Sequence, residues 1–219
     1  MSNFSNLLQI IHRGKNPYSG FPVSQWRGMW FNDPGATAGI FERAIAIAKP
    51  GIIVEVGSFV GESAIFMAKK LIEAKADAAI LCIDTWCGGV DHWTKANEKI
   101  QFHFGRQDLY YRFIANVIEQ KADGVIVPLC LDSQNAARLL AHLKIVPSLI
   151  YVDASHEAGD VLRDLQAYWS LLEIGGVLVA DDISDFFPGV VEDVNKFIKL
   201  NKIPADQIIK EKEKRLFVK

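Results

Sequence analysis

The sequence predicts a single α/β fold, in which a doubly wound and mostly parallel sheet carries an antiparallel hairpin at its C-terminal end. From Gly51 onward, short β-branched runs alternate with longer amphipathic segments, and no Pro- or Ser-rich linker divides them. The short runs are apolar throughout, as in parallel strands that helices cover on both faces. In the tail, two strand-like runs flank the charged turn Glu211–Lys214, which is the pattern of a β-hairpin.

The expected elements follow one another along the chain as one domain with a short N-terminal extension. An N-terminal helix around Leu7–Ile11 and the aromatic loop Pro17–Trp30 occupy residues 1–35, and the main domain occupies residues 36–219. The expected parallel strands are Ile52–Val56, Ala79–Ile83, Val125–Leu129, Leu149–Val152 and Val177–Ala180. The expected helices are Phe41–Ala48, Gly61–Ala74, Leu109–Lys121, Ser133–Leu143, Ala158–Leu172 and Val190–Leu200. The expected hairpin strands are Gln207–Lys210 and Arg215–Val218.

Composition excludes several functional classes. The chain has 219 residues, 50% of them hydrophobic and 23% charged, which is enough for one large core. Its net charge of −2 leaves no basic excess for binding a phosphate backbone, and no apolar run reaches the roughly 18 residues of a membrane span. Cys82, Cys87 and Cys130 form no CxxC pair, which disfavours a disulfide framework. We expect a cytoplasmic protein with no nucleic-acid or membrane partner; a homo-oligomer is compatible with this composition.

The turn after the first strand has the composition of a ligand-binding loop. Gly57 and Gly61 allow backbone amides to approach a ligand closely. Glu55 precedes them, and its carboxylate would attract a cationic or hydroxyl-bearing ligand but repel a pyrophosphate. The GxGxxG fingerprint of dinucleotide-binding proteins is missing. The alternative is that the two glycines only form a tight turn.

Acids also follow the next two strands, at the sheet edge where doubly wound folds bind ligands. Asp84 ends the second strand and suits two ribose hydroxyls, with the indole of Trp86 beside an adenine. Asp132 and Ser133 follow the third strand. Either of them also suits the N-cap of the helix that begins there, and the two roles are compatible.

These motifs resemble the class I S-adenosylmethionine-dependent methyltransferases. The resemblance runs from Ile52 to Ile183, and it rests on the stretches EVGSFVGES, IDTW, LDS, YVDASHEAGDVLRDL and GGVLVADDI. It is closest to small-molecule O-methyltransferases that act on sugars and macrolides. It implies a Rossmann-like fold, S-adenosylmethionine as methyl donor and a small hydroxylated acceptor. The cofactor-binding residues that it implies are Glu55, Gly57, Ser58, Gly61 and Ser63 for the methionine part, Asp84 for the ribose, and Trp86, Asp132 and Ser133 around the adenine.

Three carboxylates are expected at the ends of the fourth and fifth strands, namely Asp153, Asp181 and Asp182. Oxygen-only ligands suit Mg²⁺, Ca²⁺ or Mn²⁺, so we predict one divalent cation here, Mg²⁺ or Ca²⁺ foremost. Metal-dependent relatives that the chain resembles carry acids at these positions, but some of them have a further Asp where Ser155 stands. The alternative is that Asp181 and Asp182 only cap the following turn.

His156 is the histidine within this motif, and we predict that it acts as general base, with Asp153 as the second catalytic residue. The alternative is that it only ties down its loop. The glycine-rich stretch Cys87–Trp93, which contains His92, is expected to form a substrate-contacting lid. Two other functional classes remain open: a nucleotide-dependent oxidoreductase, which the missing GxGxxG and the hairpin disfavour, and a cofactor-binding protein of the same fold without catalysis.

Overall fold

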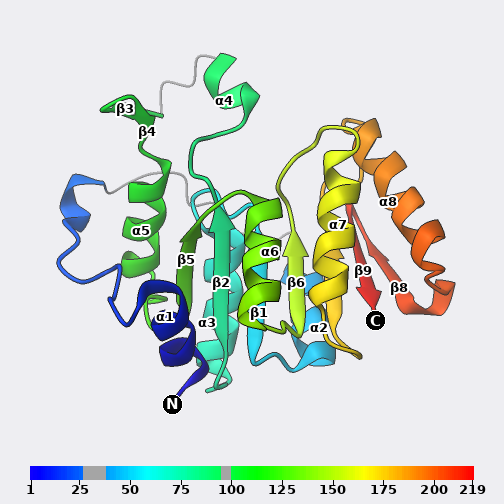
Figure 1. The fold of residues 1–219 in the computed structure, drawn as a ribbon, viewed down its shortest axis with the longest axis horizontal. Coiled ribbons are helices and arrows are strands. Elements are labelled where there is room, and N and C mark those ends of the chain that lie inside the picture. The colour runs from blue at the N-terminus through cyan, green and yellow to red at the C-terminus, as the bar shows by residue number, and fades with distance from the viewer. Residues whose placement is uncertain (27–37, 95–99) are drawn as a thin grey trace.

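The computed structural model describes residues 1–26, 38–94 and 100–219, whose main feature is a seven-stranded sheet (Figure 1). Its strands are β1 Ile52–Val56, β2 Ala79–Asp84, β5 Ile126–Cys130, β6 Leu149–Val152, β7 Val177–Ala180, β8 Ile208–Glu211 and β9 Lys214–Val218. Their order is β5-β2-β1-β6-β7-β9-β8. The first five pair in parallel, and β9 is antiparallel to both of its neighbours. The predicted fold class is confirmed.

Helices cover the two faces of the sheet in two groups. One face carries α2 Ala38–Ala48, α3 Glu62–Glu73 and α5 Leu109–Glu119. The other carries α1 Asn3–His12, α6 Ser133–Leu143, α7 Asp160–Leu171 and α8 Pro188–Asn201. Successive residues of a strand point to opposite faces, so Ile53 packs with the first group and Val54 with the second. Among the described helices, none has both the length and the apolar character needed to cross a membrane.

The predicted bounds of β1, β6, β7 and α6 match the structure. The N-terminal helix begins four residues before Leu7, and the other predicted helices and strands differ by at most three residues at either end. The structure adds elements that the pattern does not predict: α4 Val90–Thr94, β3 Phe102–His103, β4 Arg106–Gln107 and two 3-10 turns at Val23–Gln25 and Ala205–Gln207. Elements of two to five residues are too short for a hydrophobic pattern to repeat along them. Part of the predicted aromatic loop, and the boundary between residues 35 and 36, lie outside the described residues.

The hairpin brings the chain back to the carboxyl end of β7. In the antiparallel pairing of β7 with β9, Ala180 lies opposite Arg215. Continuing this register by one residue places Lys214 opposite Asp181. The last strand of the fold therefore contributes a side chain to the edge at which β1, β2 and β6 also end.

Candidate active site

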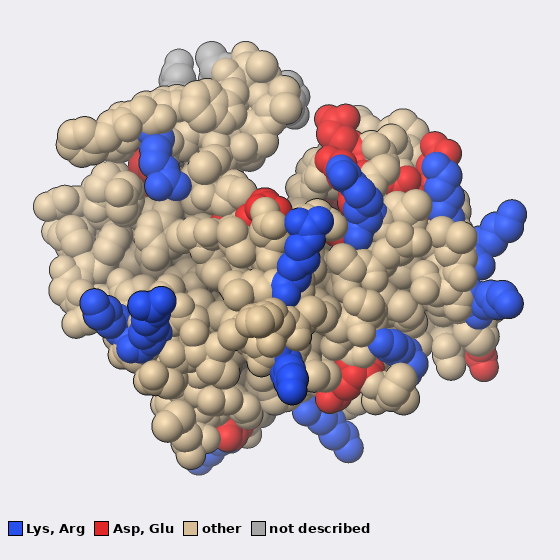
Figure 2. Space-filling model, viewed as in Figure 1, with Lys and Arg blue, Asp and Glu red and all other residues tan. Residues whose placement is uncertain are grey.

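A cavity of about 330 Å³ lies at the carboxyl ends of β1, β6 and β7. This is the edge at which doubly wound sheets bind ligands. In Figure 2 the corresponding upper edge of the molecule is divided by a notch, with acidic side chains gathered on its right-hand side. The cavity is lined by Phe41, Gly57, Ser58, Phe59, Val60, Glu62, Ser63, Tyr151, Asp153, Asp181 and Lys214.

Gly57 joins the ends of three strands. Its N–H donates to the carbonyl of Ile83 in β2 (2.9 Å), and the N–H of Asp153 after β6 donates to the carbonyl of Val56 (2.8 Å). Its φ is +89°, and a Cβ there would overlap the carbonyl oxygen of Asp153 and lie 2.7 Å from the Cα of Ala154. Glycine is therefore required both by the backbone angle and by the space.

The carboxylate of Asp84 holds the loop that follows β1. One oxygen accepts from the N–H of Phe59 (2.8 Å) and the other from the N–H of Trp86 (2.7 Å). Burial raises the pKa of Asp84, and these backbone hydrogen bonds oppose the shift. Because a carboxylate offers about four acceptor positions, these contacts leave it able to accept from a ligand as well.

The predicted role of Trp86 beside an adenine does not match its position. Its residue is 1% exposed, and its ring packs edge-on against Tyr110 with centroids 5.1 Å apart. The indole N–H donates to the carbonyl of Phe59 (2.6 Å). A ring without an exposed face cannot stack on a ligand, so Trp86 supports the loop from below. In the predicted lid, the ring of His92 stacks on the ring of Phe59, with centroids 5.1 Å apart.

Glu55 lies beneath the same loop, and its side chain does not line the cavity. The residue has no exposed surface, and its carboxylate accepts from the hydroxyl of Ser63 and from the thiol of Cys82 (3.5 Å). Burial raises its pKa, and the hydrogen bonds oppose the shift. Glu55 thus links the first turn of α3 to β2, and it acts on a ligand only through the loop.

The raised pKa of Glu55 predicts a specific dependence of stability on pH. A carboxyl group whose pKa is higher in the folded state keeps its proton where the unfolded chain is already ionised, so stability falls as pH rises through that window. We expect Glu55→Gln, which cannot ionise, to flatten the fall in stability above the ordinary carboxyl pKa. Guanidinium unfolding at a series of pH values measures it. Glu73→Gln, with a side chain 70% exposed, is the control. Equal pH profiles for wild type and Glu55→Gln would contradict the prediction.

Asp132 and Ser133 lie at the end of β5 and do not line the cavity. Asp132 caps α6 by accepting from the N–H of Asn135 (3.0 Å), as its alternative reading predicts. The hydroxyl of Ser133 donates to Asp164 (2.7 Å). Gly61 precedes α3 with a φ of +93°, packed against the ring of Phe113. Of the predicted cofactor-binding residues, the cavity wall contains Gly57, Ser58 and Ser63.

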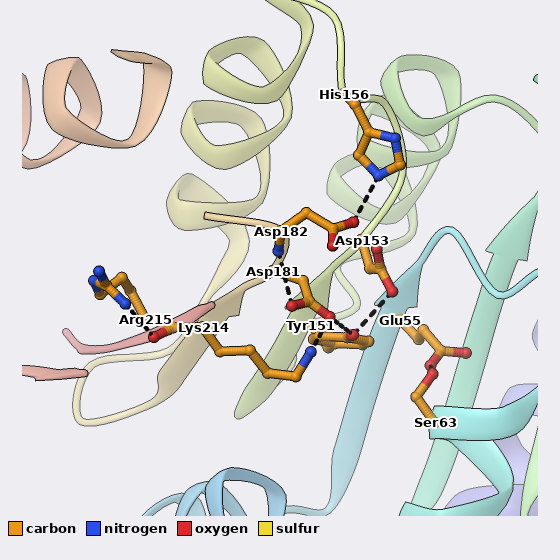
Figure 3. A network of polar contacts seen from close by, with 9 residues as sticks. All are labelled: Glu55, Ser63, Tyr151, Asp153, His156, Asp181, Asp182, Lys214 and Arg215. Carbon is orange, nitrogen blue, oxygen red and sulfur yellow. Dashed lines mark hydrogen bonds and ion pairs between the residues drawn. The ribbon is translucent and has the colours of Figure 1, made fainter. Parts of the chain in front are cut away.

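A network of four polar side chains forms the opposite wall of the cavity (Figure 3). The hydroxyl of Tyr151 is hydrogen-bonded to Asp153 (2.9 Å) and to Asp181, and its one proton serves one of them at a time. Lys214, which is 7% exposed, forms an ion pair with Asp181. Desolvation, together with the carboxylates of Asp181 and Asp182, raises the pKa of Asp153 to about 8.

His156 and Asp182 form a second pair beside this network. The Nε2 atom of His156 lies 2.7 Å from a carboxylate oxygen of Asp182, and the ring stacks on Phe187 at 4.2 Å. Hydrogen bonding to Asp182 raises the pKa of His156, and the same contact lowers the pKa of Asp182. The imidazole does not line the cavity, which weakens the case for His156 as general base.

The residues that could hold a divalent cation differ from the predicted three aspartates. Asp153, His156 and Asp182 each offer a ligand atom, and these atoms all lie within 4.8 Å of one another. Asp181 is not in this group, and one of its carboxylate oxygens is engaged by Tyr151 and Lys214. Two carboxylates and one imidazole form this group, in place of the predicted oxygen-only set, and such a donor set fits a divalent metal ion; the predicted three aspartates remain a prediction.

Tyr151 and Lys214 are the site residues that the sequence analysis missed. Tyr151 is the one hydroxyl-bearing residue of β6, a signal that could have been used. The sequence pattern places Lys214 in a charged turn, whereas β9 begins at that residue and directs it inward. A shift of one residue in the hairpin decides between these two positions.

Comparison with known proteins identifies the domain and agrees with the fold. A family model described as a methyltransferase domain matches residues 54–183, more than half of the chain. No curated protein matches the sequence.

Solved structures of similar fold have low sequence identity to the chain. An O-methyltransferase from Bacillus cereus in complex with SAH is 12% identical, with a TM-score of 0.61 over 99% of this chain and 90% of that one. The O-methyltransferase TomG from Streptomyces achromogenes, in complex with SAM, is 15% identical, with a TM-score of 0.60 over 100% and 90%. Apo CalS11, a TDP-rhamnose 3'-O-methyltransferase, is 14% identical, with a TM-score of 0.58 over 99% and 92%. At these identities the likeness establishes the fold.

Proposed function

Because the chain belongs to the methyltransferase-domain family, we propose that it transfers a methyl group from S-adenosylmethionine to a hydroxyl group of a small molecule. The observation that carries the proposal is that one cavity has two chemically different walls. One wall is the glycine loop at residues 57–63, and the other consists of carboxylate, phenol and ammonium groups. Methyl transfer needs a donor sulfur and an acceptor oxygen held in line at short range, which such a cavity can provide.

We assign the methyl donor to the carboxyl ends of β1 and β2. The loop at residues 57–63 would hold the methionine part, and the remaining acceptor capacity of the Asp84 carboxylate suits ribose hydroxyls. Asp132 and Ser133, at the end of the adjacent β5, would border the adenine. Two of the similar structures hold SAH or SAM, which supports this assignment.

We assign the acceptor to the wall formed by Tyr151, Asp153, Asp181 and Lys214. A divalent cation held by Asp153, His156 and Asp182 would lower the pKa of the acceptor hydroxyl. His156 then serves as a ligand rather than as the general base that the sequence suggested, because its ring lies outside the cavity and beside the carboxylates of Asp153 and Asp182. Asp153 lines the cavity and remains the residue closest to the chemistry. Tyr151 positions it by hydrogen bonding.

Calorimetry with S-adenosylhomocysteine and NADH tests the methyl-donor assignment. We expect S-adenosylhomocysteine to bind and NADH not to, and Asp84→Ala to weaken the former by about tenfold or more, because hydrogen bonds to a charged group contribute roughly 1.5–3 kcal/mol. Asp206→Ala, at an exposed position, is the control. Tighter binding of NADH, or unchanged affinity in Asp84→Ala, would show the donor assignment to be wrong. With donor binding established, a screen of hydroxylated small molecules for methyl incorporation identifies the acceptor.

A further inference from the structure

We propose that Lys214 determines which divalent cations this site accepts. It does so by holding the carboxylate of Asp181 out of the ligand set. The inference rests on the proposed function, which it extends from the presence of a cation to its chemical class.

The pair of Lys214 and Asp181 is fixed by the fold. The β7–β9 register places the two residues opposite each other, and Lys214 is 7% exposed. Its ammonium group also lies 5.6 Å from the ring centroid of Tyr151 and 6.0 Å from that of Phe41. A buried ammonium loses its hydration and needs a carboxylate partner, so this ion pair is more constrained than an exposed one.

Both oxygens of Asp181 are engaged (Figure 3). One takes the ammonium of Lys214 and the hydroxyl of Tyr151, and the other accepts from the N–H of Asp182 (2.8 Å). Asp182 has a φ of +57°, and its own carboxylate is paired with His156. The two adjacent aspartates are therefore separated into different partnerships, and only Asp182 belongs to the candidate cation site.

The remaining donor set has one imidazole nitrogen. Ca²⁺ and Mg²⁺ prefer oxygen ligands alone, whereas first-row transition metals accept imidazole readily. A site with Asp153, Asp182 and His156 should therefore favour Mn²⁺ over Ca²⁺. If Asp181 were released, a third carboxylate would become available, and Ca²⁺ would gain most from it.

Titration calorimetry with Mn²⁺ and Ca²⁺ tests the inference in the full chain. We expect wild type to bind Mn²⁺ at least about tenfold more tightly than Ca²⁺. We expect Lys214→Met to tighten Ca²⁺ binding by about tenfold or more, since a nearby positive charge is lost and a carboxylate is freed. The ratio of Mn²⁺ affinity to Ca²⁺ affinity should therefore become smaller than in wild type. Lys214→Arg keeps the charge and should behave like wild type. The double variant Lys214→Met with Asp181→Asn should return Ca²⁺ binding toward the wild-type value.

Two results would overturn the inference. One is an unchanged Ca²⁺ affinity in folded Lys214→Met, which would leave Lys214 with a packing role. The other is obtained with wild type alone: it would bind Ca²⁺ as tightly as Mn²⁺, or it would bind neither ion. Binding of S-adenosylhomocysteine, measured on the same samples, tests the proposed methyl donor separately. If wild type does not bind S-adenosylhomocysteine, the proposed function is contradicted, whatever the cation measurements show.

Discussion

Gly57→Ala is expected to destabilise the protein by about 3 kcal/mol or more and to abolish binding of S-adenosylhomocysteine, because a methyl group at this position overlaps backbone atoms that cannot move independently. The atoms concerned are the carbonyl of Asp153 and the Cα of Ala154. Any shift that relieves the overlap separates the loop after β1 from the loop after β6. Guanidinium unfolding measures the stability, and calorimetry measures the binding.

Gly175→Ala is the matched control. Gly175 has a similar φ of +81°, but a Cβ there would meet no atom within 4 Å. It therefore carries the cost of the left-handed backbone alone, about 1–2 kcal/mol, and should keep full binding. If Gly57→Ala is no less stable than Gly175→Ala and binds S-adenosylhomocysteine normally, then neither stability nor ligand binding requires the close packing of the two loops.

Asp153→Asn is expected to abolish binding of a divalent cation and to lower turnover by about a hundredfold or more, with binding of S-adenosylhomocysteine retained. The reason is that Asp153 both lines the cavity and belongs to the candidate ligand set. Calorimetry with Mn²⁺ measures the first effect. Strong Mn²⁺ binding in folded Asp153→Asn would exclude this carboxylate as a ligand.

The pKa of Asp153, raised from 3.8 to about 8, gives this prediction a pH signature. A ligand must lose its proton to bind a metal, so cation affinity in wild type should fall about tenfold per unit as the pH drops below about 8. Without a cation, and between pH 3.8 and about 8, Asp153 keeps its proton in the folded protein but loses it in the unfolded chain. Stability should therefore fall as the pH rises through this range. Asp153→Asn should lose this slope and be more stable than cation-free wild type near pH 8. A pH-independent Mn²⁺ affinity in wild type would contradict it.

The sequence predicts the frame of the site better than the side chains within it. Strands β1, β6 and β7 are short apolar runs bounded by turn residues. Because such strands are buried on both faces and pair on both sides, this pattern predicts them reliably. The close approach of Gly57 to Asp153 follows from the parallel pairing of β1 with β6, which the structure shows.

Directions of individual side chains depend on details that a linear pattern does not contain. Trp86 follows Asp84 by two residues, but a φ of +49° turns its ring back into the core. Lys214 lies in a charged stretch that is typical of a solvated turn. In the structure β9 begins one residue earlier than predicted, which directs the side chain of Lys214 toward Asp181. Such differences of one residue or one dihedral angle reverse which face a side chain meets.

The position of β9 between β7 and β8 also affects how the protein is made. During synthesis the five parallel strands emerge before residues 208–218, and until then β7 is an edge strand with an unpaired row of N–H and C=O groups. Its sequence is Val-Leu-Val-Ala, which is apolar and favours pairing with another chain. Docking of the hairpin therefore covers this edge as well as completing the site, and substitutions that slow its docking should reduce soluble yield even where the finished protein is stable.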